Sequence, residues 1–436
     1  MKKSLLAVAA LGAFASAAQA QSSVTVYGIL DVGYIGTNQS FNTSNTGATV
    51  ANGGTGGLNY ASVKSTQNVF SQSAESTSRL GFKGTEDMGG GTSAFFTAEF
   101  QLYPNDATLS GNTSSGLLNR QTFVGLKKNG VGQFAVGTQY TPIFNALAAT
   151  DPGQTNNMAG SVIYPKNGNG GGASDTAFTV RTSNTLSLKS DNFGGFTGSA
   201  IWMQNAKNTT EVSNTAGPVT GGNTNATGWG LGADFTYSKF YATAAYQALK
   251  QFTTASSNTL TLATEGLWNG AQANGATTAP TATALCSAST TGYTYNGCGL
   301  NIQDNQFYAG ATYDFGILKA YANYINRKAS ATGNSGYYMS RAGEQIGVRS
   351  YITPTIEGWA SAGLGRYTSF GSNQPTANFN AWQLGSNYYL SKRTNLYAIY
   401  GMTNTSNAAY TDYNTGKSFT GSFNASNYAV GVRHTF

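Results

Sequence analysis

The sequence has few charged residues and almost no histidine, cysteine or proline. Charged residues make up 9% of its 436 positions, and it contains one histidine, two cysteines and eight prolines. Average soluble proteins carry about 25% charged residues, so a soluble chain with so little charge would be prone to self-association. Beyond residue 20 no apolar run approaches the roughly 18–20 residues that a membrane-spanning helix needs. A single histidine also argues against a metal site or histidine-based acid–base chemistry.

Glycine and aromatic residues fill the gap that the missing charge leaves. There are 56 glycines, 26 tyrosines and 23 phenylalanines, and aromatic residues reach 12% of the chain. Such an aromatic content argues against a disordered protein, which would lack these residues. The formal net charge is +7, but the basic residues do not form runs, which argues against a nucleic-acid-binding arm. The composition is typical of many β-strands with one apolar face.

The first twenty residues have the three-part pattern of a secretory signal peptide. A basic start at Met1-Lys2-Lys3 precedes an apolar stretch from Leu5 to Ala17, and Ala18-Gln19-Ala20 forms an A-x-A cleavage site. The alternative is a short buried helix. We expect cleavage after residue 20, which leaves residues 21–436 as one exported domain.

The two cysteines, Cys286 and Cys298, match no zinc or redox spacing. An exported chain is exposed to oxidising conditions, where such a pair can form a disulfide. The sequence alone leaves both the bridged and the free state open.

Apolar and polar residues alternate along most of the exported chain. In the segment 303–314, Phe307, Ala309 and Ala311 alternate with polar or small residues. Because successive side chains of a strand point to opposite faces, such a segment has one wet and one apolar face. No segment shows a clear helical stripe. Sixteen segments are predicted as strands: 23–36, 77–87, 92–103, 118–127, 132–139, 178–189, 196–205, 228–237, 239–250, 303–314, 317–328, 339–351, 354–366, 378–391, 392–404 and 425–436.

The connections between these segments alternate between long and tight. Eight are long and rich in Gly, Asn, Ser and Thr, and seven are tight turns such as Asn129-Gly130. Long connections therefore gather at one end and tight turns at the other. This pattern predicts an all-β fold, a 16-stranded antiparallel transmembrane β-barrel of the outer-membrane type. A large secreted β-sandwich or β-solenoid is the soluble alternative, but no fixed-period repeat supports a solenoid.

Four stretches carry a family resemblance: 23–31 (SVTVYGILD), 78–87 (SRLGFKGTED), 119–126 (NRQTFVGL) and 430–436 (VGVRHTF). Together they resemble the general porins of Gram-negative outer membranes, in particular the trimeric porins typical of β-proteobacteria. The resemblance implies a homotrimer, and a third long loop, here about 140–177, that folds into the barrel. It also implies a pore constriction in which basic strand residues face an acidic loop.

The constriction candidates are Arg79, Lys83, Arg120 and Arg181 on the strands, and Asp151 and Asp175 on the loop. Alternation with Leu80 and Phe82 independently places Arg79 and Lys83 in the lumen. The direction of Arg120 stays open, because its parity is shared with Val124 and Leu126. The alternative for the arginines is simple solvation by pore water. Where the family commonly has Gly-Arg-Gln on the fifth strand, this chain has Gly137-Thr138-Gln139, and so lacks one positive charge.

The chain ends on Phe436. Tyr428, Val430, Val432, His434 and Phe436 share one parity, which predicts a lipid-facing row on the last strand. By resemblance, the terminal Phe436 is the signal that the barrel-assembly machinery reads. An ordinary last strand is the alternative.

The leading hypothesis is an outer-membrane porin, not an enzyme, for passive diffusion of small hydrophilic solutes and ions. A sixteen-stranded barrel is wide enough for an aqueous channel. A substrate-specific porin for sugars or anions is the alternative, and an outer-membrane enzyme or adhesin is a third. The expected partners are solutes, outer-membrane lipid and the assembly machinery, with no cofactor and no nucleic acid.

Overall fold

The computed structural model describes residues 23–42, 50–51, 57–58, 62–110, 116–166, 177–212, 220–253, 300–331, 338–369, 376–411 and 418–436. The predicted signal peptide 1–20 and the cysteines Cys286 and Cys298 lie outside these residues. Among the described residues, no helix has the length and apolar character needed to cross a membrane.

One large antiparallel sheet accounts for most of the described chain. Its strands are β1 (Ser23–Asn42), β4 (Ser62–Gln72), β5 (Arg79–Gly89), β6 (Thr92–Gln101), β7 (Leu118–Lys128), β8 (Gly132–Tyr140), β9 (Arg181–Ser190), β10 (Phe196–Val212), β11 (Thr220–Tyr237), β12 (Phe240–Thr253), β13 (Leu300–Asp314), β14 (Lys319–Ala331), β15 (Tyr338–Thr353), β16 (Ile356–Ser369), β17 (Ala377–Tyr389), β18 (Thr394–Thr411) and β19 (Ser418–Thr435). A separate hairpin pairs β2 (Val50–Ala51) with β3 (Gly57–Leu58).

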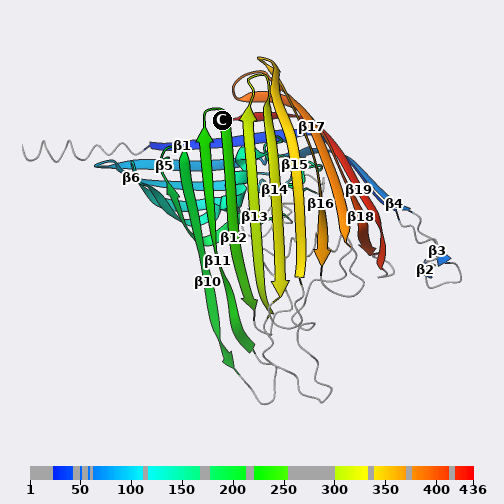
Figure 1. The fold of residues 1–436 in the computed structure, drawn as a ribbon, viewed down its shortest axis with the longest axis horizontal. Coiled ribbons are helices and arrows are strands. Elements are labelled where there is room, and N and C mark those ends of the chain that lie inside the picture. Colours follow the sequence, from blue (N-terminus) through cyan, green and yellow to red (C-terminus); the bar gives the residue numbers. More distant parts are fainter. Residues whose placement is uncertain are drawn as a thin grey trace, which may run out of the picture.

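The sheet closes on itself, because the first strand pairs with the last. In β1, Ile29 pairs with Thr435 and Asn42 with Ser422 of β19. On its other edge β1 pairs with β4 and β5, which lie end to end along it. The seventeen strands of the sheet therefore form a closed barrel of sixteen positions, with β4 and β5 sharing one. In Figure 1, β10 to β19 run side by side, with their tight turns at the top.

The predicted barrel and its strand order are confirmed, and several strands run further than the prediction. β10 reaches Val212 and β18 reaches Thr411, each beyond its predicted end. β1 reaches Asn42, where the alternation pattern predicts a long loop from residue 37. These extensions lie on the long-loop side.

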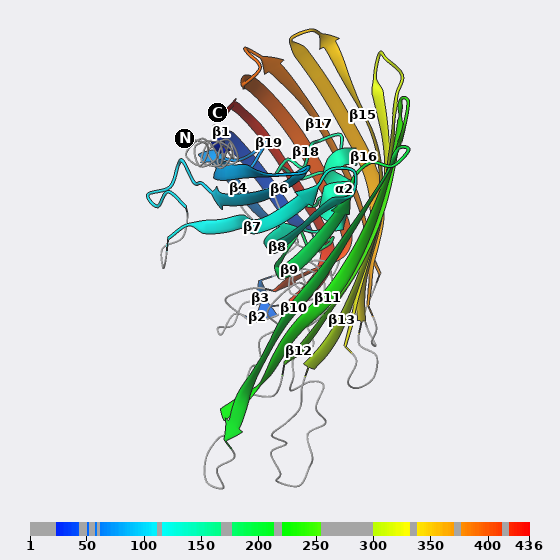
Figure 2. The ribbon, with the colours of Figure 1, turned by 90° about the vertical axis from the view of Figure 1, so that its left-hand side faces the viewer.

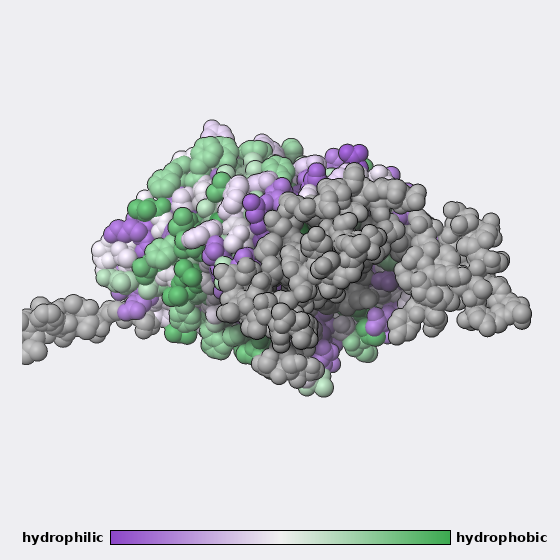
Figure 3. Space-filling view, turned by 90° about the horizontal axis from the view of Figure 1, so that it is seen from below, coloured by the Kyte–Doolittle hydropathy of each residue, from purple (hydrophilic) through white to green (hydrophobic). Residues whose placement is uncertain are grey.

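As predicted, successive side chains of a strand face opposite sides of the barrel wall. On the last strand Tyr428, Val430 and Val432 are 40–51% exposed on the outer face, while Ala429 is buried. Figure 3, seen from the long-loop end, shows hydrophobic side chains gathered on the flank of the barrel. An apolar outer face is what lipid tails require.

The second barrel strand is interrupted, which the sequence pattern does not predict. Between β4 and β5 the chain leaves the sheet over Ser73–Ser78, a segment that we call the inward excursion. Ser73 has a φ of 65°, and Ala74 and Ser78 are fully buried. The carboxylate of Asp31 on β1 accepts hydrogen bonds from the backbone N–H of Glu75 and Ser76, at 2.9 and 2.6 Å. The strand expected at 77–87 is therefore β5. The barrel position that β5 shares with β4 begins earlier, at Ser62.

The third long connection contains a helix, α2 (Pro142–Thr150), where no helix is predicted from the sequence. Thr141 caps its N-terminus by accepting a hydrogen bond from the N–H of Phe144, and Pro142 fits the first helical position. The helix contacts β11, β12 and β13, and Figure 2 shows it on the concave side of the sheet. The predicted inward folding is confirmed for the described part of this loop, up to residue 166.

A candidate pore constriction

Arg79 and Lys83 lie on the same inward-facing side of β5. The Nε of Arg79 donates to the carbonyl of Thr77 at 2.8 Å, which ties the guanidinium to the inward excursion. The Nζ of Lys83 lies 5.3 Å from the ring centroid of Tyr27 on β1. Lys83 is exposed although it points inward, so it faces open space in the lumen.

A β-bulge sets the direction of Arg120. Between β6 and β7, Glu99 pairs with Gln121 and Phe100 pairs with Asn119. Arg120 is therefore an extra residue of β7 with no residue opposite it in the strand register. Such an extra residue re-aims the side chains around it. Val124 on the same parity is 62% exposed to the outside, whereas Arg120 is 7% exposed. The bulge therefore turns Arg120 into the barrel.

Glu99 on β6 holds this basic cluster together. Its Oε1 accepts a hydrogen bond from Nε of Arg120 at 2.8 Å and lies 3.9 Å from Nη1 of Arg79. Its Oε2 accepts from the Tyr27 hydroxyl at 3.1 Å. Glu99 is missing from the residues predicted from the sequence, although its inward parity with Thr97 was a usable signal.

Arg181, at the start of β9, belongs to an aromatic cluster beside Arg120. Its guanidinium carbon lies 5.9 Å from the ring centroid of Tyr140, and the Tyr140 hydroxyl accepts from Nη2 of Arg120 at 2.7 Å. The Tyr140 ring stacks on Phe144 of α2 at 4.1 Å. Arg120 and Arg181 line a small cavity of about 40 Å³ with Lys166 of the loop. This volume suits a few water molecules or a small anion.

Asp151 does not face these arginines. It follows α2 directly and is 4% exposed. Its carboxylate accepts from the backbone N–H of Thr155 at 2.7 Å and of Gly153 at 3.2 Å, so it shapes the loop itself. Burial raises the pKa of the Asp151 carboxyl, and these hydrogen bonds act against the rise. Asp175, the other predicted loop carboxylate, lies outside the described residues.

Three side chains of β15 clamp the third loop to the inner wall. Nη2 of Arg341 donates to the carbonyl of Val162 at 2.7 Å, and Nη1 of Arg349 donates to the carbonyl of Pro152 at 2.7 Å. Between them, Oε1 of Gln345 accepts from the Val162 N–H at 2.8 Å. Residues 341, 345 and 349 share one inward-facing row, because side chains two apart in a strand point the same way.

Glutamine and asparagine side chains extend this anchoring around the barrel. On β17, Gln383 donates to the carbonyls of Met158 and Ala159 at 2.8 and 2.6 Å. On β19, Asn427 accepts from the Ala159 N–H at 3.0 Å. The loop approaches so closely that a Cβ on Gly401 would collide with the Ala159 carbonyl oxygen. The wall therefore fixes the loop along much of its length.

At the chain end, Phe436 is 41% exposed. Its backbone exchanges two hydrogen bonds with Gly28 of β1, at 3.0 and 3.1 Å. His434 on the same strand shares a hydrogen bond with Thr394 at 2.9 Å. Phe436 thus lies at the seam where β1 and β19 close the barrel. Its role as an assembly signal stays a prediction.

The structure thus brings Arg79, Arg120 and Arg181 together around Glu99 and Tyr140, with Lys83 nearby. A family model described as Gram-negative porin matches residues 7–408. The chain belongs to the Gram-negative porin family. Its relatives place it in the outer membrane and indicate a channel rather than an enzyme.

Two relatives of this porin are outer-membrane porins of other bacteria. It is 32% identical over 222 residues to outer membrane porin protein 32 of Delftia acidovorans, an alignment that covers 51% of this chain and 55% of the relative. It is 27% identical over 463 residues to an outer membrane porin protein of Bordetella pertussis, an alignment that covers 100% of both chains.

Among solved structures, the porin is similar to an anion-selective porin from Comamonas acidovorans. The TM-score is 0.61 at 19% identity, with 95% of this chain and 100% of that chain covered. At this identity the likeness shows the barrel fold.

Proposed function

We propose that this porin forms a water-filled channel for passive diffusion of small hydrophilic solutes and ions, with a preference for anions. One observation supports the preference: Arg79, Arg120 and Arg181 gather on the inner wall with a single described carboxylate, Glu99, among them. A narrow passage lined by one sign of charge raises the local concentration of the opposite ion.

The acidic side of the predicted constriction needs revision in this proposal. Asp151 is buried and bonded within the loop, so it contributes little to a field across the passage. Asp175 lies outside the described residues. We therefore attribute the anion preference to Arg79, Arg120 and Arg181, which we call the basic wall. Lys83 and Lys166 add to their positive charge.

The test is a bilayer recording under a salt gradient. We expect steady single-channel conductance and a reversal potential on the anion side. The triple variant with Arg79→Gln, Arg120→Gln and Arg181→Gln should move this potential toward the cation side. Lys392→Gln, at the tight turn between β17 and β18, is the control and should leave it unchanged. Insertion without conductance would refute diffusion, and an unchanged potential in the triple variant would refute the role of the arginines.

The substrate-specific alternative has one observation in its favour. Tyr140, Phe144 and Tyr164 place aromatic rings next to Arg181 and Lys166, with the Lys166 Nζ 4.4 Å from the Tyr164 ring centroid. An ion or a solute with a ring would therefore interact more strongly with this cluster than with water. Saturation of the current by one solute would establish this alternative, whereas a current linear in concentration supports general diffusion.

We further propose that the porin assembles as a homotrimer through the wall formed by β1 and β5 to β8. Large apolar side chains are exposed there, among them Val26, Val124 and Val136. Cross-linking of the native outer membrane should yield a species of three chains, and a monomer alone would refute trimer assembly.

A further inference from the structure

The guanidinium of Arg79 takes its position from the inward excursion. Its Nε donates to the Thr77 carbonyl at 2.8 Å, and its Nη2 donates to the Ser76 hydroxyl at 3.2 Å. Its ion-pair contact with Glu99, from Nη1 to Oε1, is 3.9 Å long, which is too long for a hydrogen bond. The place of the Arg79 charge in the passage therefore depends on where Ser76 and Thr77 are held.

One residue of the third loop binds the inward excursion through three hydrogen bonds. Asn157, which is 8% exposed, donates from its backbone N–H to the Ala74 carbonyl at 2.9 Å. Its Nδ2 donates to the Ser73 carbonyl at 2.7 Å and to the Thr77 hydroxyl at 3.1 Å. A side-chain amide has two hydrogens to donate, so Asn157 uses both of them on the excursion.

Apolar packing supports the same contact. Ala74 of the excursion and Met158 of the loop are both fully buried and belong to one hydrophobic cluster, together with Trp359 and Tyr397 of the barrel wall. Met158 directly follows Asn157 in the chain. Burial next to this cluster shields the Asn157 hydrogen bonds from water and strengthens them.

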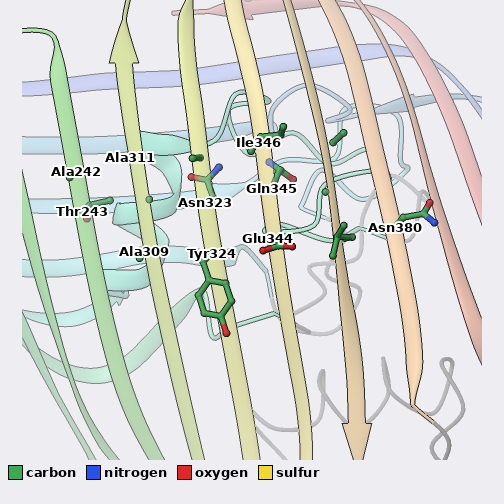
Figure 4. A pocket seen from close by; sticks show the side chains of 15 residues that line it. Ala242, Thr243, Ala309, Ala311, Asn323, Tyr324, Glu344, Gln345, Ile346 and Asn380 are labelled. Carbon is green, nitrogen blue, oxygen red and sulfur yellow. The ribbon is translucent and has the colours of Figure 1, made fainter.

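The loop around Asn157 is itself fixed to the barrel wall. On one side of it, Nε2 of Gln383 on β17 donates to the Ala159 carbonyl at 2.6 Å. Further along the loop, Gln345 on β15, which is labelled in Figure 4, accepts from the Val162 N–H at 2.8 Å. The inward excursion is therefore attached through Asn157 to a segment that the wall holds in place.

We propose that Asn157 is a positioning residue for anion permeation. It joins the third loop to the inward excursion, and the excursion holds the Arg79 guanidinium in the passage instead of against Glu99. This inference rests on the proposed anion preference and adds to it a residue that carries no charge.

The expected effect of losing the Asn157 side chain follows from the neighbours of Arg79. Thr77 would be less firmly held, and Arg79 would close its 3.9 Å gap to Glu99, because charge-assisted hydrogen bonds between arginine and carboxylate are strong. An arginine that is paired in this way contributes less to the positive potential that attracts anions.

The first test is the reversal potential of single channels under a salt gradient. Asn157→Ala should move this potential toward the cation side, but less far than Arg79→Gln does, because the Arg79 charge is still present. Thr77→Val, which removes the hydroxyl that Asn157 binds, should move it in the same direction and replaces Asn157→Ala if that variant fails to fold. An unchanged potential in the folded variant would overturn the proposal.

Asn156→Ala is the matched control. Asn156 is the preceding loop residue and is 2% exposed. Its side chain donates to Oε1 of Gln383 at 3.0 Å and accepts from the Met158 N–H at 2.9 Å, so these bonds join the loop to β17 and to itself. This variant should lose thermal stability as Asn157→Ala does and keep the original reversal potential. Equal shifts of the potential in the two variants would indicate general loosening of the loop and overturn the proposal.

A double variant tests whether Asn157 acts through Arg79. In a porin that already carries Arg79→Gln, Asn157→Ala should cause no further shift of the reversal potential. A further shift as large as that of Asn157→Ala alone would overturn the positioning role.

A crystal structure of Asn157→Ala separates this inference from the proposed function. It should show Arg79 within hydrogen-bond distance of Glu99, whereas an Arg79 that remains bound to Ser76 and Thr77 would overturn the proposal. Absence of anion preference in the unchanged porin would refute the proposed function, and the crystal structure would then still decide whether Asn157 holds Arg79 in place.

Discussion

Arg120 and Glu99 form a buried ion pair, with Arg120 Nε donating to Glu99 Oε1 over 2.8 Å, although Arg120 shares its strand parity with outward-facing Val124. The β-bulge between β6 and β7 resolves this conflict by turning Arg120 inward. The basic wall thus contains a residue that strict alternation would place outside the lumen.

Removal of the Glu99 charge should strengthen anion preference. Glu99→Gln keeps the size of the side chain and removes the carboxylate nearest to Arg79 and Arg120. The reversal potential under a salt gradient should move further toward the anion side. The variant should also lose thermal stability, because buried cations without their partner cost about 3–5 kcal/mol. Glu86→Gln, at an exposed position of the neighbouring strand β5, is the control. A shift toward cations would contradict the prediction.

Gln345 should control the steadiness of the open channel. Gln345→Ala leaves the buried Val162 N–H without its acceptor, at a cost of roughly 1–3 kcal/mol. Arg341 and Arg349 still hold the loop on either side, so the barrel should assemble normally. We expect more open-channel current noise and closure at lower voltage in single-channel records. Gln133→Ala, an exposed glutamine near a tight turn of β8, should behave like the unchanged protein, and equal noise in both variants would contradict the role of Gln345.

Asp31 should stabilise the inward excursion more than any single one of its donors does. Asp31→Ala leaves the N–H groups of Glu75 and Ser76 and the Tyr397 hydroxyl without their acceptor. Each buried orphan costs roughly 1–3 kcal/mol. Tyr397→Phe removes one of the three hydrogen bonds and should cost about 1 kcal/mol. The temperature at which the folded barrel loses resistance to detergent should therefore fall far more for Asp31→Ala. Similar losses in the two variants would contradict this account.

The barrel was predictable from sequence because one alternating face must be apolar wherever the strand crosses lipid. Above the hydrocarbon this constraint ends, so the extensions of β10 to Val212 and of β18 to Thr411 carry no such signal. Helix α2 did leave a signal, since Thr141-Pro142 is a good N-cap followed by a proline at the first helical position. Nine residues are too few for a clear helical stripe.

The site was predictable only in part, for a similar reason. Arg79 and Lys83 follow the alternation of β5, but a bulge decides Arg120 and its register is a tertiary property. The burial of Asp151 depends on the turn that its carboxylate makes with Gly153 and Thr155. The clamp formed by β15 requires a loop partner 179–197 residues away, which local pattern does not encode.

Deletion of Phe436 should separate folding from recognition in the cell. The residue contributes two backbone hydrogen bonds to Gly28 at the barrel seam, and each is worth only about 1 kcal/mol. The shortened porin should therefore still fold from denaturant into detergent, with a slightly lower melting temperature. In cells it should reach the outer membrane in much smaller amounts, because the assembly machinery would lack its signal. Phe436→Tyr, which keeps the ring and the terminal carboxylate, is the control and should assemble well. Normal outer-membrane levels of the shortened chain would refute the signal, whereas failure to refold in detergent would assign Phe436 a structural role instead.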